Sequence, residues 1–196
     1  MQIVLASANE GKIREFKTLL TPLKIDIIPQ SQFNIQSAEE TGSTFIENAI
    51  LKARHATEQS QLPALADDSG LIIPALAGRP GIYSARYAGP EANAKDNMSK
   101  ILQELSFIPD GDRYAYFYCV LVLMLSFDDP APIVCEGYFE GSILTEPCGT
   151  EGFGYDPIFF VPSKNCAAAE LAPAEKNKIS HRAMALHYLL QRIKTL

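Results

Sequence analysis

Short apolar runs alternate with apolar residues at helical spacing along the first part of the chain. The run at 2–6 predicts a strand, and apolar positions three and four apart over 13–20 predict a helix after it. A second strand is expected at 24–29, and the polar segment 30–43 is expected to be a long loop. The early chain therefore alternates strand and helix.

A capping-box pattern marks the start of the next helix. Thr44 is followed three residues later by Glu47, and the apolar face beyond them predicts a helix to about Ser60. Apolar residues at 63–76 then predict a strand or hairpin, which we expect to be interrupted by a carboxylate-bearing turn at 67–70.

The longest segments of β type lie in the second half. Residues 113–125 and 133–144 are β-branched, aromatic and apolar, and we expect two long strands that pair as antiparallel neighbours. The other predictions are a loop at 77–90, a helix at about 91–105, a Gly-rich loop at 149–156, a short strand at 157–161 and a terminal helix at 180–193. Together the elements predict an α/β fold with helices packed on a mixed central sheet.

Length and composition are those of a globular protein. The chain has 196 residues, of which 47% are apolar, enough for a sizeable core. We predict a single domain over residues 1–196, and one large lobe with a smaller appendage is the alternative. The apolar run at 119–125 is far shorter than the roughly 20 residues of a membrane-spanning helix, which excludes a membrane protein.

Charge and cysteine spacing exclude further classes of protein. A formal charge of −6 leaves no large basic surface, so we expect no nucleic-acid partner. The four cysteines never approach CxxC spacing, so we expect reduced thiols and neither a zinc site nor a dithiol centre. Because the N-terminus lacks the basic and apolar regions of a signal peptide, a cytoplasmic location is expected.

The segment at 7–12 is the first candidate for chemistry. It reads Ser-Ala-Asn-Glu-Gly-Lys between a predicted strand and helix, where backbone N–H groups and the helix dipole favour an anion. It is not a Walker A loop, because the Gly that should precede the Gly-Lys pair, with four residues between them, is absent. The segment is either a phosphate-binding loop or an ordinary turn with a surface lysine, Lys12.

Carboxylates form the second candidate group. Asp67 and Asp68 are adjacent, and Mg²⁺ binds proteins through one or two carboxylates together with water and phosphate. Because successive strand residues point to opposite faces, we expect only one of the two to enter such a site. The alternative is a solvated acidic turn, and the same alternative applies to Glu39 and Glu40.

Two late segments have the residue types of a base-binding site. The loop at 149–156 combines glycines, which allow close approach of a ligand, with two aromatic residues suited to stacking. The alternative is a hairpin whose aromatics pack in the core. Lys176, Ser180, His181 and Arg182 lie at the start of the last helix, where Ser180 is alternatively a simple N-cap with the others exposed.

Together these segments describe a nucleotide site, and the chain resembles the inosine triphosphate pyrophosphatase family. The similarity is closest to the bacterial members that act on dITP and XTP. The shared motifs follow the family order: SxNxGK at 7–12, TFIENAILKARHA at 44–56, ADDSGL at 66–71, PGIYSARYAG at 80–89, GFGYDPIFF at 152–160 and SHR at 180–182.

The resemblance implies a fold and an activity. Members of the family have a long mixed sheet, with helices that form two lobes around an active-site cleft. They hydrolyse non-standard purine nucleoside triphosphates, such as ITP, dITP, XTP and dXTP, to the monophosphate and pyrophosphate, which keeps these nucleotides out of DNA and RNA. The family uses Mg²⁺ and works as homodimers, so both are expected here.

The same resemblance assigns the phosphate and metal residues. Glu40 and Asp68 would hold Mg²⁺, and Asp68 would also be the base that orients or deprotonates the attacking water. The triphosphate would be held by Ser7, Asn9, Lys12 and Lys52, together with the backbone of Ala8, Glu10 and Gly11.

Residues from the late segments would bind the base, and Ser69 would be a further substrate contact. Phe153 would stack on the purine. Lys176, His181 and Arg182 would place hydrogen-bond donors near its 6-position, which favours a 6-keto oxygen over the amino group of adenine. The loop would be shaped by Gly154, Tyr155 and Asp156.

Two other functions remain open from the residues alone. One is a nucleotide-sensing module that binds without turnover, against which Asp68 argues because a sensor needs no base. The other is a pyrophosphatase for modified pyrimidine nucleotides. The sequence leaves open the preference among inosine, xanthosine and deoxy forms, and whether Glu39 or Asp67 touches the metal.

Overall fold

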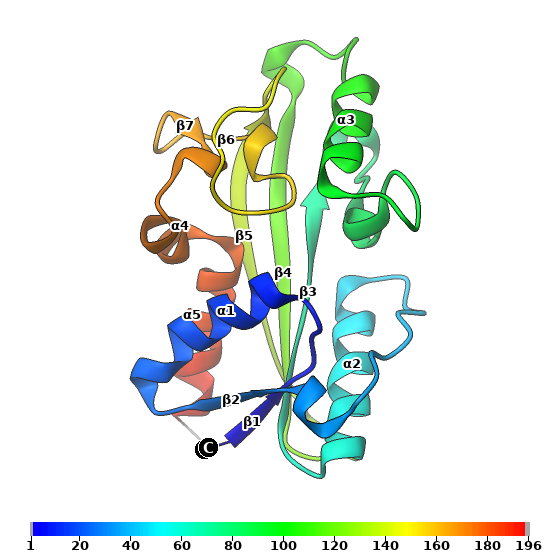
Figure 1. Ribbon diagram of the computed structural model, residues 1–196, viewed down its shortest axis with the longest axis vertical. Coiled ribbons are helices and arrows are strands. Elements are labelled where there is room, and N and C mark those ends of the chain that lie inside the picture. The colour runs from blue at the N-terminus through cyan, green and yellow to red at the C-terminus, as the bar shows by residue number, and fades with distance from the viewer. Residues whose placement is uncertain (1, 195–196) are drawn as a thin grey trace. The chain divides into compact units, whose positions relative to one another are not determined.

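The computed structural model describes residues 2–194, which form one seven-stranded mixed sheet with helices (Figure 1). The strand order is β2-β1-β3-β4-β5-β6-β7. β1 (Gln2–Leu5) pairs in parallel with β2 (Asp26–Pro29) and with β3 (Ala64–Ile72). β6 (Phe159–Val161) is antiparallel to its neighbours β5 (Ile133–Ile143) and β7 (Cys166–Ala167). The predicted α/β class with a mixed sheet is confirmed.

The two longest strands are neighbours, as predicted from their composition. β4 (Tyr114–Met124) lies beside β5 in the sheet. The amide of Ile143, at the end of β5, donates to the carbonyl of Arg113, just before β4, at 2.9 Å. The start of one strand therefore meets the end of the other, which is the antiparallel arrangement.

The chain divides into two compact units. Unit 1 holds the described parts of Met1–Asp68, Cys119–Glu136 and Ala185–Leu196, and unit 2 holds Ser69–Tyr118 and Gly137–Met184. The boundaries fall inside β3, β4 and β5, so these three strands contribute residues to both units.

Unit 1 has helices on both sides of its strands. In Figure 1, α1 (Glu10–Leu20) and the unit 1 part of α5 (His181–Ile193) lie on one side, and α2 (Phe45–Ser60) lies on the other. The apolar face of α1 buries Phe16 and Leu20 in the core of this unit. The buried face of α2 consists largely of alanines, at Ala49, Ala53 and Ala56.

Unit 2 has a core of its own, built around aromatic rings. The ring of Phe159 lies 4.7 Å from that of Phe117 and 5.3 Å from that of Phe139, in tilted arrangements. Ile101 from α3 (Ala94–Glu104) joins the same buried cluster. No helix within residues 2–194 combines the length and the apolar character that a membrane crossing requires.

The carboxylates at 67–70 do not lie in a turn. β3 runs without a break from Ala64 to Ile72, and Asp67 and Asp68 are both buried within it. The prediction of an interrupting turn was therefore wrong. Asp, Ser and Gly favour turns only when water satisfies their polar groups, and here ion pairs to lysines hold the two carboxylates inside a strand.

Other differences from the predicted elements concern helix starts and short segments. The helix expected from about residue 91 begins at Ala94, because Asn93 caps it and forms a capping box with Asp96. The loop expected at 77–90 contains the 3-10 helix η4 (Gly81–Arg86). Two short elements were not predicted, β7 and α4 (Pro173–Ile179).

The close approach of β5 to β6 depends on Gly141. A Cβ atom at this position would lie 2.2 Å from the carbonyl oxygen of Phe160 and 2.7 Å from ring atoms of Phe159. We expect Gly141→Ala to lower the free energy of unfolding by about 1–3 kcal/mol, the usual cost of overpacking. Urea denaturation measures the change.

Gly111→Ala is the matched control for this prediction. A Cβ at Gly111 would have no atom within 4 Å, and its φ is not in the left-handed region. We expect no loss of stability, or a gain of up to about 1 kcal/mol from the stiffer unfolded chain. Equal losses in the two variants would contradict the steric explanation.

Candidate functional site

The predicted site residues fall into two groups, one in each unit. The phosphate and metal candidates belong to unit 1, and the base candidates belong to unit 2. Only Asp68 and Ser69 adjoin one another across the boundary, as consecutive residues of β3. Each group is described by itself.

Residues 7–12 form the turn from β1 into α1. Two backbone amides of this turn donate to side-chain oxygens. Ser7 Oγ accepts from the amide of Asn9 at 3.1 Å, and Asn9 Oδ1 accepts from the amide of Lys12 at 3.1 Å. Asn9 is thus the N-cap of an 11-residue helix. Ala8, Asn9 and Glu10 are exposed, so the positive end of α1 is open to an anion.

Lys12 is held over this turn by a buried carboxylate. Its ammonium forms an ion pair with Oδ1 of Asp67, whose side chain has no exposed surface. The other oxygen, Oδ2, accepts from the thiol of Cys119 at 3.4 Å. Asp67 therefore acts as the anchor of Lys12, whose side chain is 16% exposed.

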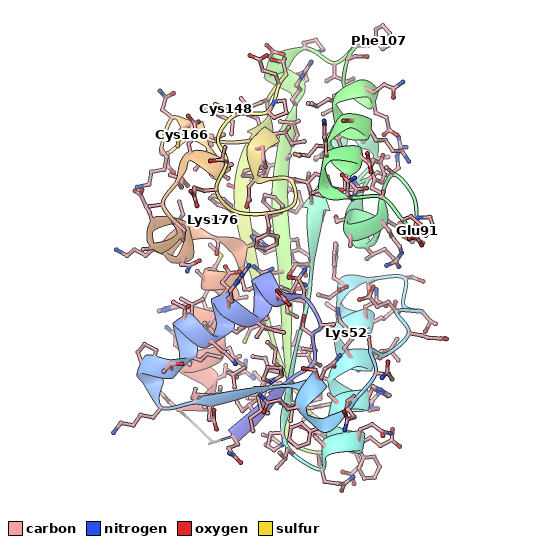
Figure 2. The ribbon with its side chains drawn as sticks, viewed as in Figure 1. Lys52, Glu91, Phe107, Cys148, Cys166 and Lys176 are labelled. Carbon is pink, nitrogen blue, oxygen red and sulfur yellow. The ribbon has the colours of Figure 1, made fainter. Side chains whose placement is uncertain are left out.

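Lys52 joins the two predicted metal ligands. From α2, its Nζ lies 2.7 Å from Oδ1 of Asp68 and 3.1 Å from Oε1 of Glu40 (Figure 2). Asp68 is 7% exposed and Glu40 is half-buried, so water screens this cluster only partly. Asp67 and Asp68 have different lysine partners, as expected for neighbours on one strand.

Burial and the neighbouring charges act in opposite directions on the pKa values of this cluster. Burial raises the pKa of Asp68 above the ordinary 3.8, against the opposing effects of the Lys52 and Lys12 ammonium groups. Burial alone would lower the pKa of Lys52, but the charge and hydrogen bond of Asp68, with the charge of Glu40, raise it above 10.5. Lys52 is therefore a cation at neutral pH, and Asp68 is a stronger base than an ordinary aspartate.

Glu40 and Asp68 have the chemistry of a divalent cation site. Their two carboxylates converge on one positive charge, the Lys52 ammonium, which marks where a cation is stabilised. Two carboxylates with phosphate and water are the usual ligands of Mg²⁺. Asp67 is occupied by Lys12 and Cys119, Glu39 is exposed, and residues 2–194 contain no cluster of three or more metal-binding side chains.

In unit 2, Asp156 shapes the Gly-rich loop. Its Oδ2 accepts from the amide of Phe153 at 2.7 Å and from Lys176 Nζ at 2.5 Å, and the residue is 2% exposed. The Cβ of any residue other than glycine at Gly152 would lie 2.1 Å from the same oxygen, and Gly152 has a φ of +78°. Asp156 thus orders the loop and presents the ring of Phe153, which is 43% exposed.

Two cations lie against the exposed ring. Nζ of Lys176, which belongs to α4 (Figure 2), is 5.0 Å from the centroid of Phe153, and Cζ of Arg182 is 5.9 Å from it. Arg182 is 2% exposed, and its Nη2 donates to Ser69 Oγ at 3.5 Å. His181 is also buried and stacks on Phe117 at 5.0 Å. The alternative in which these residues are exposed is wrong.

Ser180 and Tyr155 both have structural contacts of their own. Ser180 Oγ accepts from the amide of Ala183 at 3.2 Å. Ser180 therefore caps the last helix, as the N-cap alternative predicts. Tyr155 is buried in the core of unit 2, and its hydroxyl donates to the carbonyl of Ser84 at 2.6 Å. Gly154 adjoins it with a φ of +64°, which favours glycine.

Sequence reasoning did not assign Asp67, Cys119 or Ser84 a part in the site. Cys119 is expected as a reduced thiol, and the structure shows that it is buried and forms no disulfide. Its contact with Asp67 has no signature in spacing, because 52 residues separate the two. The only available signal was the pair of adjacent aspartates in an apolar segment, which required two cationic partners.

Comparison with known families was made on the whole chain. A family model described as the Ham1 family matches residues 3–192. The dITP/XTP pyrophosphatase of Vibrio cholerae is 56% identical over 193 residues, which are 98% of this chain and 96% of the relative. The dITP/XTP pyrophosphatase of Escherichia coli K12 is 53% identical and is covered to 98%, as is this chain.

Solved structures match over nearly the same length. A HAM1 protein from Coxiella burnetii has a TM-score of 0.93 and 53% identity, with both chains covered completely. A dITP/XTP pyrophosphatase from Mycobacterium abscessus has a TM-score of 0.77 and 38% identity, with 97% of this chain and 99% of that one covered.

The electrostatic description of Asp68 can be tested by titration. We expect the carboxyl carbon of Asp68 to titrate in ¹³C NMR with a midpoint above 3.8 in metal-free protein. Lys52→Met should move the midpoint further up, because a positive charge that favours the carboxylate is lost. Glu175, whose pKa the Lys164 ammonium lowers below 4.5, is the internal control and should not respond. A downward shift of Asp68 would contradict the assigned causes.

Proposed function

The chain belongs to the Ham1 family, and on this premise we propose that it hydrolyses non-standard purine nucleoside triphosphates to the monophosphate and pyrophosphate. ITP, dITP, XTP and dXTP are the proposed substrates, whose removal keeps them out of DNA and RNA. The observation that carries the proposal is the cluster of Asp68, Glu40 and Lys52, in which a buried base lies beside a bound positive charge.

Unit 1 would bind the triphosphate. The open N-terminus of α1 offers backbone N–H groups at Ala8, Glu10 and Gly11, and Ser7 and Asn9 add polar side chains. Lys12 and Lys52 bring positive charge from α1 and α2 to oxygens that gain negative charge in the transition state. Positioning and charge neutralisation of this kind are the main requirements of phosphoryl and nucleotidyl transfer.

Asp68 would accept the proton of the attacking water. Its raised pKa makes its carboxylate a better base than that of an exposed aspartate, while the neighbouring ammonium groups favour the deprotonated form. Glu40 and Asp68 would hold Mg²⁺, which when bound supplies positive charge to the phosphate oxygens. Lys52 would then be released from the two carboxylates toward the phosphates.

Unit 2 would recognise the base. The ring of Phe153 is exposed for stacking, and Arg182 and Lys176 lie against the same ring. We propose that Arg182, with His181 beside it in the chain, donates to the 6-keto oxygen of the purine. Adenine presents an amino group there, which would leave buried donors without acceptors.

A sensor that binds nucleotides without turnover is disfavoured by the environment of Asp68. Burying a carboxylate costs free energy, and binding alone could be achieved with the lysines and the helix terminus. The family resemblance also implies a homodimer and a cytoplasmic location. Both stay predictions, because the single chain described here carries no observation on either.

The activity and its base can be tested together. We expect pyrophosphate release from ITP, dITP and XTP at a much higher rate than from ATP, and only with a divalent cation present. Asp68→Asn should lower turnover at least about a hundredfold, because a positioned acid or base contributes on that scale. Calorimetry should still detect ITP binding by the variant. Near-normal turnover by Asp68→Asn would remove it from the mechanism.

Base selection by Arg182 is tested by comparing two substrates. Arg182→Ala should lower kcat/KM for ITP about ten- to a hundredfold more than for ATP, because a charged donor loses its acceptor. Arg182→Lys should restore only part, since lysine lacks the planar guanidinium. Both variants are assayed at one fixed Mg²⁺ concentration. An unchanged ITP to ATP ratio would place base selection elsewhere.

A further inference from the structure

Ser84 joins two parts of unit 2, the strand β3 and the Gly-rich loop. It lies in η4, within the motif at 80–89 to which the proposed chemistry gives no role. Its Oγ accepts from the amide of Leu71 at 2.9 Å and donates to the carbonyl of Gly81 at 2.6 Å. Its own carbonyl accepts from the Tyr155 hydroxyl at 2.6 Å. The side chain and the backbone of one residue thus hold β3 and the Gly-rich loop.

The segment around Ser84 is itself firmly held. Asn97 of α3, which is 4% exposed, donates through Nδ2 to the carbonyl of Ala85 at 3.2 Å and accepts through Oδ1 from the amide of Ala88 at 2.7 Å. Lys100 of the same helix donates to the carbonyl of Tyr87 at 2.7 Å. Ser84 therefore belongs to a segment anchored on α3, from which both of its contacts can be positioned.

Both contacts of Ser84 lead to the base-binding residues. Leu71 follows Ser69 by two residues in β3, and Ser69 accepts from Arg182. Tyr155 follows Phe153 by two residues, and its buried ring leaves it little freedom.

The contacts close into a ring, because Arg182 lies 5.9 Å from the Phe153 ring. Around the ring the order is Arg182, Ser69, Leu71, Ser84, Tyr155 and Phe153. All of its members belong to unit 2. Along this order Ser84 lies three steps from Arg182 on one side and two steps from Phe153 on the other.

We propose that Ser84 is a positioning residue for base selection, which sets the Arg182 guanidinium against the Phe153 ring. The aromatic ring of Phe153 orients the base by stacking. The Arg182 guanidinium must then meet the 6-keto oxygen of the base within hydrogen-bonding distance and angle. A displacement of either part would weaken that bond more than it weakens the stacking. This inference rests on the proposed function, since it assigns part of the preference for ITP over ATP to Ser84.

The test is the binding of ITP and ATP to the full chain without divalent cations, by calorimetry. We expect Ser84→Ala to reduce the ratio of the two affinities about three- to tenfold, the scale of one neutral hydrogen bond. Ser84→Thr keeps the hydroxyl and should restore most of the wild-type ratio. Inorganic tripolyphosphate, which lacks a base, should bind wild type and Ser84→Ala equally.

Ser60→Ala is the matched control. Ser60 is also half-buried, and its Oγ likewise donates to a carbonyl, that of Ala56 at 2.6 Å, and accepts from an amide, that of Leu62 at 3.2 Å. It lies in unit 1, outside the ring. Its loss should lower the melting temperature by an amount similar to Ser84→Ala and leave the ITP to ATP ratio unchanged.

A second break in the ring keeps the test informative if Ser84→Ala does not fold. Tyr155→Phe removes only the bond to the Ser84 carbonyl, and it should reduce the ratio in the same direction. The double variant should be no worse than the more affected single variant, because one break already opens the ring. Additive effects on the ratio would overturn the proposal.

The two levels of inference fail differently. If wild type prefers ITP and Ser84→Ala keeps that preference while losing thermal stability, Ser84 is only structural and the proposed function stands. If wild type binds ITP and ATP equally and releases pyrophosphate from neither, the proposed function falls together with the inference. If the ratio changes as expected in Ser84→Ala but not in Ser60→Ala, the positioning role is established.

Discussion

Two adjacent buried carboxylates on β3 constrain unit 1 more than any other feature. A buried carboxylate without a partner costs several kcal/mol, so Asp67 and Asp68 each require a cation. Because strand residues alternate in direction, the two cations come from different helices, Lys12 from α1 and Lys52 from α2. The ion pairs therefore tie the turn at 7–12 and the capped helix to the same strand, and they bring the positive charges of the proposed catalytic site to one place.

The same pairing explains why this cluster suits a reaction on phosphates. Lys12 is anchored by a carboxylate that has no exposed surface, so it stays where it is. Lys52 is shared between the more accessible Glu40 and Asp68, so under the proposed function a metal ion and a substrate would exchange with it. One lysine is a fixed contact and the other is an exchangeable one, although both lie next to aspartates that are consecutive in sequence.

In unit 2, the proposed base recognition depends on a loop that would be disordered by its glycines alone. Asp156 removes that freedom by accepting from the amide of Phe153 and from Lys176, which leaves the Phe153 ring exposed and a cation against it. The same loop is bound through Tyr155 to the segment that contains Ser84. Stacking and hydrogen bonding to a base would then be set by contacts that never touch the base, which is how a flexible sequence could give a selective site.

Periodicity, the capping box at Thr44 and Glu47, and the order of the motifs were enough to predict the α/β class, the main helices and the two long strands, because these depend on local patterns. Local patterns also misled where polar residues are buried. Asp67 to Gly70 reads as a turn, and only ion pairs to distant lysines make it a strand. Cys119 and Lys12 lie 52 and 55 residues from Asp67, and Tyr155 lies 71 residues from Ser84, so only tertiary structure decided these contacts. Long-range hydrogen bonds leave no periodic trace in a single sequence.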